Sequence, residues 1–220
     1  MCGIVGVLAD SPDEHEVRVK RMTTCLSHRG PDDSGYAVCA ARDHDPRAWL
    51  FGHRRLSVID LSPAAHQPMT DARNGNAIVF NGEIYNFIEL RSLLESKGYH
   101  FISRADTEVV LAAYSHWGTS VVDHLRGMFA FAIFDAATGK VLLGRDRLGE
   151  KPLYYCLRPT VAGIRFAFAS EIRALLAGGI VSPTIARSGL QTYMTNGFVV
   201  GPTTLIEGIR LLDTGTTLTV

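Results

Sequence analysis

The second residue of the chain is a cysteine, and removal of Met1 would leave a thiol and a free α-amine on one residue. An α-amine titrates at a pKa of about 7.7–8, so it can accept a proton near neutral pH. A thiol, with a pKa of about 8.5, needs only modest activation to become a nucleophile. The two groups together form a nucleophile and its base, as in enzymes with an N-terminal threonine. Cys2 is therefore a candidate catalytic residue.

Two other interpretations of Cys2 stay open when the residue is taken alone. Cysteine is often buried, so Cys2 could be a small apolar residue at the edge of a core strand, and this is the more common case. A lipid attachment site would need a second membrane signal or a basic patch, and neither accompanies Cys2. The four cysteines show no C-x-x-C spacing, so we expect neither a metal site nor a disulfide framework.

The composition is that of an ordinary globular protein. The chain has 220 residues, of which 46% are hydrophobic and 20% charged, enough to bury a sizeable core. Basic and acidic residues balance at 22 each, and no basic stripe is present, which argues against nucleic acid as a partner. No apolar run approaches the ~20 residues of a membrane span. The expected location is the cytoplasm, where cysteines stay reduced.

Strands dominate the predicted secondary structure, and the helices come between groups of them. Ser11 and Glu14 form an S-x-x-E pattern that predicts a capped helix, with Val19, Met22 and Leu26 facing inward. Further helices are predicted after Asn86, with an inner stripe of leucines at 90, 93 and 94, after Asp106, and near 171–177 and 187–193. Strands are predicted at 4–8, 35–39, 50–53, 77–81, 128–135, 140–145, 153–156 and 164–169. This order favours an α+β fold over strict β-α alternation.

Seven segments together resemble the class II glutamine amidotransferases, which are N-terminal-nucleophile hydrolases, and in particular their asparagine synthetase branch. They occur in the family's order over residues 1 to about 215. They are M-C-G-I-V-G-V at 1–7, H-R-G-P-D at 28–32, F-G-H-R-R-L-S-V-I-D at 51–60, N-G-E-I-Y-N at 81–86, D-T-E at 106–108, G-R-D-R-L-G with K-P-L-Y-Y at 144–155, and F-A-S-E at 168–171.

The resemblance implies a four-layer αββα sandwich with Cys2 at the start of an inner strand. It also implies that Asn81 and the Gly82 backbone N–H form an oxyanion hole. Arg55 would pair with the α-carboxylate of glutamine, because a guanidinium fork fits two oxygens. Asp106 and Glu83 would hold its α-ammonium. The backbone from Arg55 to Ile59, with Leu56, would line the pocket.

Taken without the resemblance, the same residues have simpler interpretations. Asn81-Gly82 after a strand is a common hairpin signal. Asp106 precedes a helix and would be an N-cap. Arg55 would be a solvated surface arginine. The segment 145–155 has no glutamine role that its residues suggest, and we interpret it as a structured loop that faces a partner domain.

By resemblance, the expected reaction is hydrolysis of L-glutamine to glutamate and ammonia through a Cys2 thioester, without a cofactor. We expect residues 1–215 to form this glutaminase domain and 216–220 to begin the connection to a C-terminal synthetase domain. That domain would use ATP and Mg²⁺ to convert aspartate to asparagine, and its S-G-G-x-D-S loop is absent from this sequence.

Two alternatives remain. The ammonia could go to another carboxylate, as L-L-D-T-G at 211–215 departs from the family's L-P-P-G. Alternatively, the domain could bind glutamine or act structurally without hydrolysing it. The expected partners are glutamine and the synthetase domain, with a homodimer as one further assembly and no nucleic acid or membrane.

Overall fold

Two antiparallel sheets form the centre of the molecule in the computed structural model, which describes residues 1–40 and 46–220. The six-stranded sheet has the order β10-β8-β9-β1-β3-β2, and the five-stranded sheet has the order β11-β7-β6-β5-β4. The first sheet consists of β1 (Gly3–Ala9), β2 (Asp33–Ala40), β3 (Ala48–Arg55), β8 (Tyr154–Cys156), β9 (Ile164–Ala169) and β10 (Arg210–Leu211). The second consists of β4 (Met69–Thr70), β5 (Ala77–Ile84), β6 (Gly127–Phe134), β7 (Val141–Arg145) and β11 (Thr217–Thr219).

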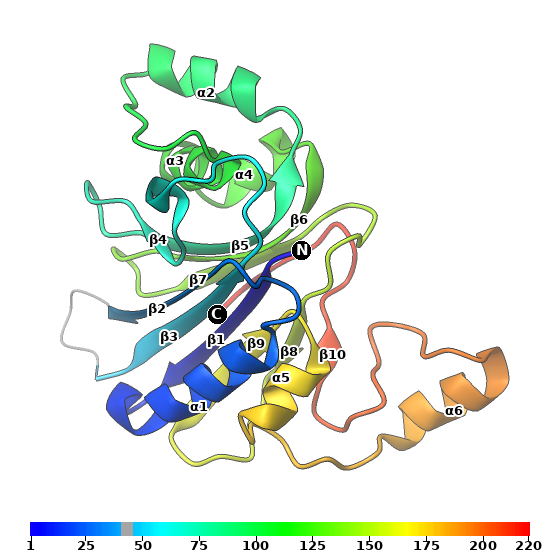
Figure 1. The fold of residues 1–220 in the computed structure, drawn as a ribbon. Helices are drawn as coiled ribbons and strands as arrows, with labels where there is room; N and C mark the ends of the chain where they lie inside the picture. The colour runs from blue at the N-terminus through cyan, green and yellow to red at the C-terminus, as the bar shows by residue number, and fades with distance from the viewer. Residues whose placement is uncertain (41–45) are drawn as a thin grey trace.

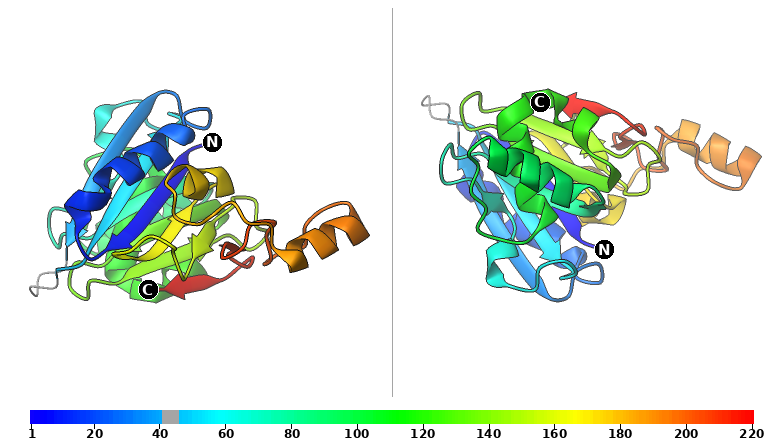
Figure 2. Two further views of the ribbon diagram at one scale, coloured as in Figure 1. Left: turned by 90° about the horizontal axis from the view of Figure 1, so that it is seen from below. Right: turned by 90° about the horizontal axis from the view of Figure 1, so that it is seen from above.

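Helices cover the outer face of each sheet (Figure 1). The six-stranded sheet carries α1 (Pro12–Cys25) and α5 (Ile172–Ala177), and the five-stranded sheet carries α2 (Phe87–Ser96), α3 (Asp106–Trp117) and α4 (Val121–His124). Short 3₁₀ turns lie at Pro63–Ala65 and Gly118–Ser120. The predicted four-layer αββα sandwich is therefore confirmed. A further helix, α6 (Arg187–Asn196), projects away from the sandwich (Figure 2).

Three apolar clusters hold the four layers together. The middle cluster lies between the sheets and is rich in aromatic side chains, with Trp49, Phe51 and Phe168 within about 6 Å of one another. The outer clusters join α1 and α5 to one sheet and α2, α3 and α4 to the other. β1 is buried on both faces, as predicted, because it is a central strand between two layers.

Two of the predicted helix caps are wrong in their hydrogen bonding. Ser11 is the N-cap of α1, but the bond there runs from the Glu14 N–H to the Ser11 carbonyl, and no side-chain cap is found among the described residues. The Asn86 side chain instead accepts a bond from the Arg126 N–H at 2.9 Å and donates to the His124 carbonyl at 3.0 Å. The amide is drawn away because the chain entering β6 passes close to it.

The strand predictions hold, with one difference that matters for the site. The hairpin between β6 and β7 is confirmed. β5, however, continues through Gly82 to Ile84, and Gly82 pairs with Phe129 of β6. The hairpin interpretation of Asn81-Gly82 is therefore wrong, because β6 supplies a partner along the whole strand. The predicted inner stripe of α2 is also partly wrong, since Leu93 is 44% exposed.

The C-terminal residues Thr217–Thr219 form an edge strand on β7. The proposed boundary after residue 215 and the further domain stay predictions. No helix in the described ranges is long and apolar enough to cross a membrane.

Candidate active site

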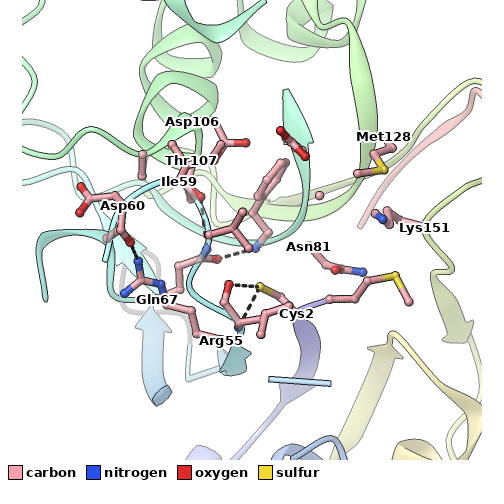
Figure 3. A pocket seen from close by; sticks show the side chains of 18 residues that line it. Cys2, Arg55, Ile59, Asp60, Gln67, Asn81, Asp106, Thr107, Met128 and Lys151 are labelled. Carbon is pink, nitrogen blue, oxygen red and sulfur yellow. Dashed lines mark hydrogen bonds between the residues drawn. The ribbon is translucent and has the colours of Figure 1, made fainter. Parts of the chain in front are cut away.

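Cys2 immediately precedes β1, and its thiol lies at the bottom of a cavity between the two sheets (Figure 3). The Leu56 N–H donates to Sγ at 3.4 Å, and Sγ lies 3.7 Å from the Leu56 carbonyl. Burial raises the pKa of the Cys2 thiol, while the Leu56 bond, the amino terminus and Arg55 oppose this rise. The thiol therefore needs a nearby base to become a thiolate.

Arg29 fixes the backbone of Cys2. Its Nε donates to the Cys2 carbonyl at 2.8 Å, and its Nη1 donates to Glu171 at 2.9 Å. The Arg29 side chain is largely buried, so this pair is better shielded from water than a surface ion pair. The H-R-G-P-D segment and the F-A-S-E segment thus meet behind Cys2, which explains why both segments belong to one site.

Asn81 presents an unpaired amide to the cavity. The residue is only 1% exposed, and neither its Nδ2 nor its Oδ1 has a hydrogen-bond partner among the described residues. A buried polar group without a partner costs about 1–3 kcal/mol, so native structures rarely retain one without a reason. A ligand that enters this cavity is the natural partner for the amide.

Gly82 allows β5 to approach β6 closely beside Asn81. A Cβ at this position would lie 2.3 Å from the Met128 carbonyl oxygen and 2.7 Å from the Phe129 Cα. Both contacts are with backbone, which cannot move aside without distorting the sheet. Glycine is therefore required here by close approach and not by a turn.

Arg55 lies at the opposite end of the cavity from Lys151 and Met128 (Figure 3). It is 7% exposed, so the interpretation as a solvated arginine is wrong. Its guanidinium donates to the carbonyls of Asp60 and Ser62, which folds the loop after β3 around it. The cation is thus held in place while remaining in the cavity wall.

The Asp60 carboxylate holds this loop against the segment before α3. It accepts the Ser62 N–H and the Arg104 N–H, each at 2.8 Å. Hydrogen bonds from Ser62 and Arg104 lower the pKa of Asp60 to about 2. The loop carries Leu56 and Ile59 into the cavity wall, where they were predicted to lie.

Asp106 is the first residue of α3, and Ala105 occupies the N-cap position. The carboxylate is 5% exposed and accepts the Ile84 N–H at 3.0 Å. Burial raises the pKa of Asp106 to about 6, and the nearby Glu83 adds to the rise. The simple N-cap interpretation is wrong, because the side chain bonds across to β5 and borders the cavity together with Glu83.

Several cavity residues were not predicted from the sequence, among them Gln67, Thr107, Met128 and Lys151. Gln67 donates to Thr107 Oγ1 at 3.2 Å and accepts the Phe80 N–H at 2.7 Å, so it joins α3 to β5. A lone glutamine in a loop gives no signal of such a role. Lys151 belongs to the K-P-L-Y-Y segment, for which the sequence suggested no function in the site.

The cavity is large enough for a small metabolite. Its volume of about 170 Å³ is more than ten times the roughly 10–15 Å³ that one water requires. It brings together all the predicted site residues: Cys2, Arg55, Leu56, Ile59, Asn81, Gly82, Glu83 and Asp106. Within residues 1–40 and 46–220, no group of three or more His, Cys, Asp or Glu is arranged to hold a metal ion.

The αββα sandwich, with Cys2 just before an inner strand, is a fold of the N-terminal-nucleophile hydrolase type. A family model described as a glutamine amidotransferase domain matches residues 1–220. The chain therefore belongs to the glutamine amidotransferase domain family.

Individual relatives agree with this assignment. The chain is 40% identical over 225 residues to asparagine synthetase (glutamine-hydrolyzing) 1 of Bacillus subtilis (strain 168). The alignment covers 100% of this chain and 33% of that protein. It is 36% identical over 190 residues to amidase chry2 of Gibberella zeae (strain PH-1), covering 86% of this chain and 26% of that protein. The chain thus spans about a third or less of these two relatives.

A solved structure supports the fold. Glutamine phosphoribosylpyrophosphate amidotransferase from B. subtilis superposes with a TM-score of 0.62 at 20% identity, over 81% of this chain and 44% of that chain.

Proposed function

We propose that this domain hydrolyses L-glutamine to glutamate and ammonia, with Cys2 as the nucleophile after removal of Met1. The observation that carries the proposal is the meeting in one cavity of the half-buried Cys2 thiol and an Asn81 amide that has no partner among the described residues, with charged groups also lining that cavity. Acyl transfer from an amide needs such a nucleophile and a hydrogen-bond donor for the developing oxyanion. No metal or other cofactor enters the steps described next.

In the first step the α-amine of Cys2 takes the thiol proton, and Sγ attacks the side-chain carbonyl carbon of glutamine. The carbonyl oxygen becomes an oxyanion, which accepts bonds from Asn81 Nδ2 and the Gly82 N–H. The intermediate collapses as the C–N bond breaks, and the α-ammonium returns its proton to the leaving nitrogen. Ammonia departs, a γ-glutamyl thioester remains, and water releases glutamate and restores the thiol.

The far wall of the cavity suits the amino-acid end of glutamine. Arg55 would pair with the α-carboxylate, because its guanidinium is buried and oriented by two carbonyls. Asp106 and Glu83 would hold the α-ammonium, since both acids line the cavity and Glu83 is near enough to raise the pKa of Asp106. Leu56 and Ile59 would cover the aliphatic part of the substrate.

The fate of the ammonia is the wider part of the proposal. We infer that the ammonia passes to a synthetase domain that makes asparagine from aspartate with ATP and Mg²⁺. The similarity to an asparagine synthetase supports this inference. The expected location of the enzyme is the cytoplasm. A different acceptor is the alternative, favoured by the similarity to a protein named an amidase. A homodimer is a further expectation. Expressing a chain extended beyond Val220 and assaying asparagine formation from aspartate would separate the two acceptors.

The hydrolase itself is tested with purified protein whose loss of Met1 has been verified by mass spectrometry. Glutamate release from glutamine should be abolished in Cys2→Ala. Absence of release from the processed wild type would support a non-hydrolysing glutamine-binding domain. Equal release from Cys2→Ala would refute Cys2 as the nucleophile.

A further inference from the structure

The segment between β7 and β8 is built around two buried charged residues. Asp146 accepts the N–H groups of Leu148, Glu150 and Lys151 at 3.0–3.1 Å. Its carboxylate also accepts the Phe129 N–H at 3.2 Å, which joins the segment to β6 at the cavity wall.

Arg145 completes this clamp from the other side. Its guanidinium donates to the carbonyls of Lys151, Gly149 and Leu212 at 2.6–2.9 Å. The backbone of Lys151 is thus bonded at both its N–H and its carbonyl. The buried side chains of Asp146 and Arg145 therefore fix the backbone position of Lys151 through hydrogen bonds.

The Lys151 side chain points into the cavity that holds Cys2 and Asn81, from the end opposite Arg55 (Figure 3). The residue is 7% exposed, yet no carboxylate or hydrogen-bond acceptor contacts its ammonium in the described part of the chain. A cation that no carboxylate of the described residues neutralises acts through its field on the other ionisable groups that line the same cavity.

One ionisable group at this cavity is the amino terminus. Met1 and Cys2 both line the cavity that Lys151 enters, so removal of Met1 leaves the Cys2 amine beside that cavity. We propose that Lys151 is a positioning residue for the hydrolysis: its ammonium holds the α-amino group of Cys2 in the unprotonated form that accepts the thiol proton. This inference rests on the proposed function.

Two cations act on the amino terminus, Arg29 and Lys151. Burial lowers the pKa of the Met1 amino group, Arg29 and Lys151 lower it further, and the Cys2 thiol and Asp32 oppose them. Arg29 is paired with Glu171, whose carboxylate also pairs with His28 and Arg173, whereas no ion pair of Lys151 is found among the described residues. Of the two cations, Lys151 is the one that lines the cavity together with Cys2.

The two ends of the cavity act on different groups. Arg55 favours the Cys2 thiolate and Asp106 disfavours it. Lys151 lowers the pKa of the Met1 amino group, as does Arg29. Within the cavity itself, Arg55 therefore acts on the proposed nucleophile and Lys151 on its proposed proton acceptor.

Lys151→Met tests the inference, because it removes the charge and keeps an unbranched apolar side chain of similar length. Lys140→Met is the matched control, since Lys140 is exposed in the turn at the other end of β6. Lys151→Arg keeps the charge. In each protein, glutaminase kcat/KM is measured from pH 5.5 to pH 9.5.

We expect Lys151→Met to lose roughly threefold to tenfold in kcat/KM at pH 6.5 and less than about twofold at pH 9, because the amine then deprotonates only at higher pH. Lys140→Met and Lys151→Arg should keep the wild-type profile. An unchanged profile in Lys151→Met, or an equal loss at every pH, would overturn the inference.

A second measurement does not depend on hydrolysis. In a Cys2→Ser background, the α-amine is titrated by competitive acetylation, with mass spectrometry of the N-terminal peptide. The titration should move to higher pH in Lys151→Met and should stay in place in Lys140→Met. If the wild type hydrolyses no glutamine, the proposed function fails, while this titration still decides whether Lys151 controls the amine.

Discussion

Replacing Asn81 with alanine should lower the rate of glutamine hydrolysis sharply and leave the fold as stable as before or more stable. The amide of Asn81 is buried with both polar atoms unpaired among the described residues, so it contributes no hydrogen bond to the folded state. Loss of one oxyanion donor typically costs about 2.7–4 kcal/mol of transition-state stabilisation, or roughly 10²–10³ in kcat.

The expected change in stability follows from the same amide. An unsatisfied buried polar group costs about 1–3 kcal/mol. Removing the amide relieves part of this cost, and the space it leaves adjoins the cavity, so water can enter. We therefore expect the free energy of unfolding to stay within about 0.5 kcal/mol of the wild type or to rise by about 1–2 kcal/mol.

Asn76 provides a matched control immediately before the same strand. Asn76 is also buried, but its Oδ1 accepts the Ala136 N–H at 2.9 Å. Asn76→Ala should lose about 1–3 kcal/mol of stability, because the Ala136 N–H is left unpaired. It should change kcat little, since Asn76 does not line the cavity.

Urea denaturation of both variants, with kcat and KM for glutamine, decides the matter. The reasoning is refuted if Asn81→Ala is destabilised as much as Asn76→Ala, because the amide would then be structural. It is equally refuted if kcat falls less than about tenfold, since one donor of an oxyanion hole should contribute more than that.

Two further changes test the substrate wall and the sheet. Burial raises the pKa of Asp106 to about 6, so this carboxyl stabilises the fold most below its unfolded pKa, near 3.8, and that stability is lost as pH rises through about 6. Substrate binding has the opposite pH dependence, because the ionised carboxylate that would hold the α-ammonium is lost as pH falls through about 6. The KM for glutamine should therefore rise below pH 6 in the wild type, and Asp106→Asn should show a high KM without this pH dependence and without lower stability at pH 7. A low KM in Asp106→Asn would contradict the substrate role. Gly82→Ala should lose about 1–3 kcal/mol of stability and most of the activity, because its Cβ would lie 2.3 Å from the Met128 carbonyl oxygen. An unchanged melting temperature, measured by circular dichroism, would contradict this prediction, because β5 and β6 would then move apart at no cost in free energy.

The sequence predicted most of the strands and helices, because alternation and helical spacing of apolar residues are local properties. It was less successful with caps. Ser11 and Asn86 stand at the predicted N-cap positions, but the Asn86 side chain bonds elsewhere, because the chain entering β6 competes for it. Asn81-Gly82 was ambiguous for a related reason, since a local pair of residues does not reveal whether a strand continues beside a partner.

What the sequence by itself determined was the family and the candidate nucleophile. A thiol beside a free amine depends only on residue type and position, and the ordered motifs from Met1 to Glu171 follow from the sequence alone. The tertiary structure decided the rest. Three features depend on segments far apart in the chain: the Asn81 amide has no partner among the described residues, Arg55 is buried, and Lys151 lines the same cavity as Cys2. Burial, pairing and electric field arise from those contacts, so no local pattern of residues can encode them.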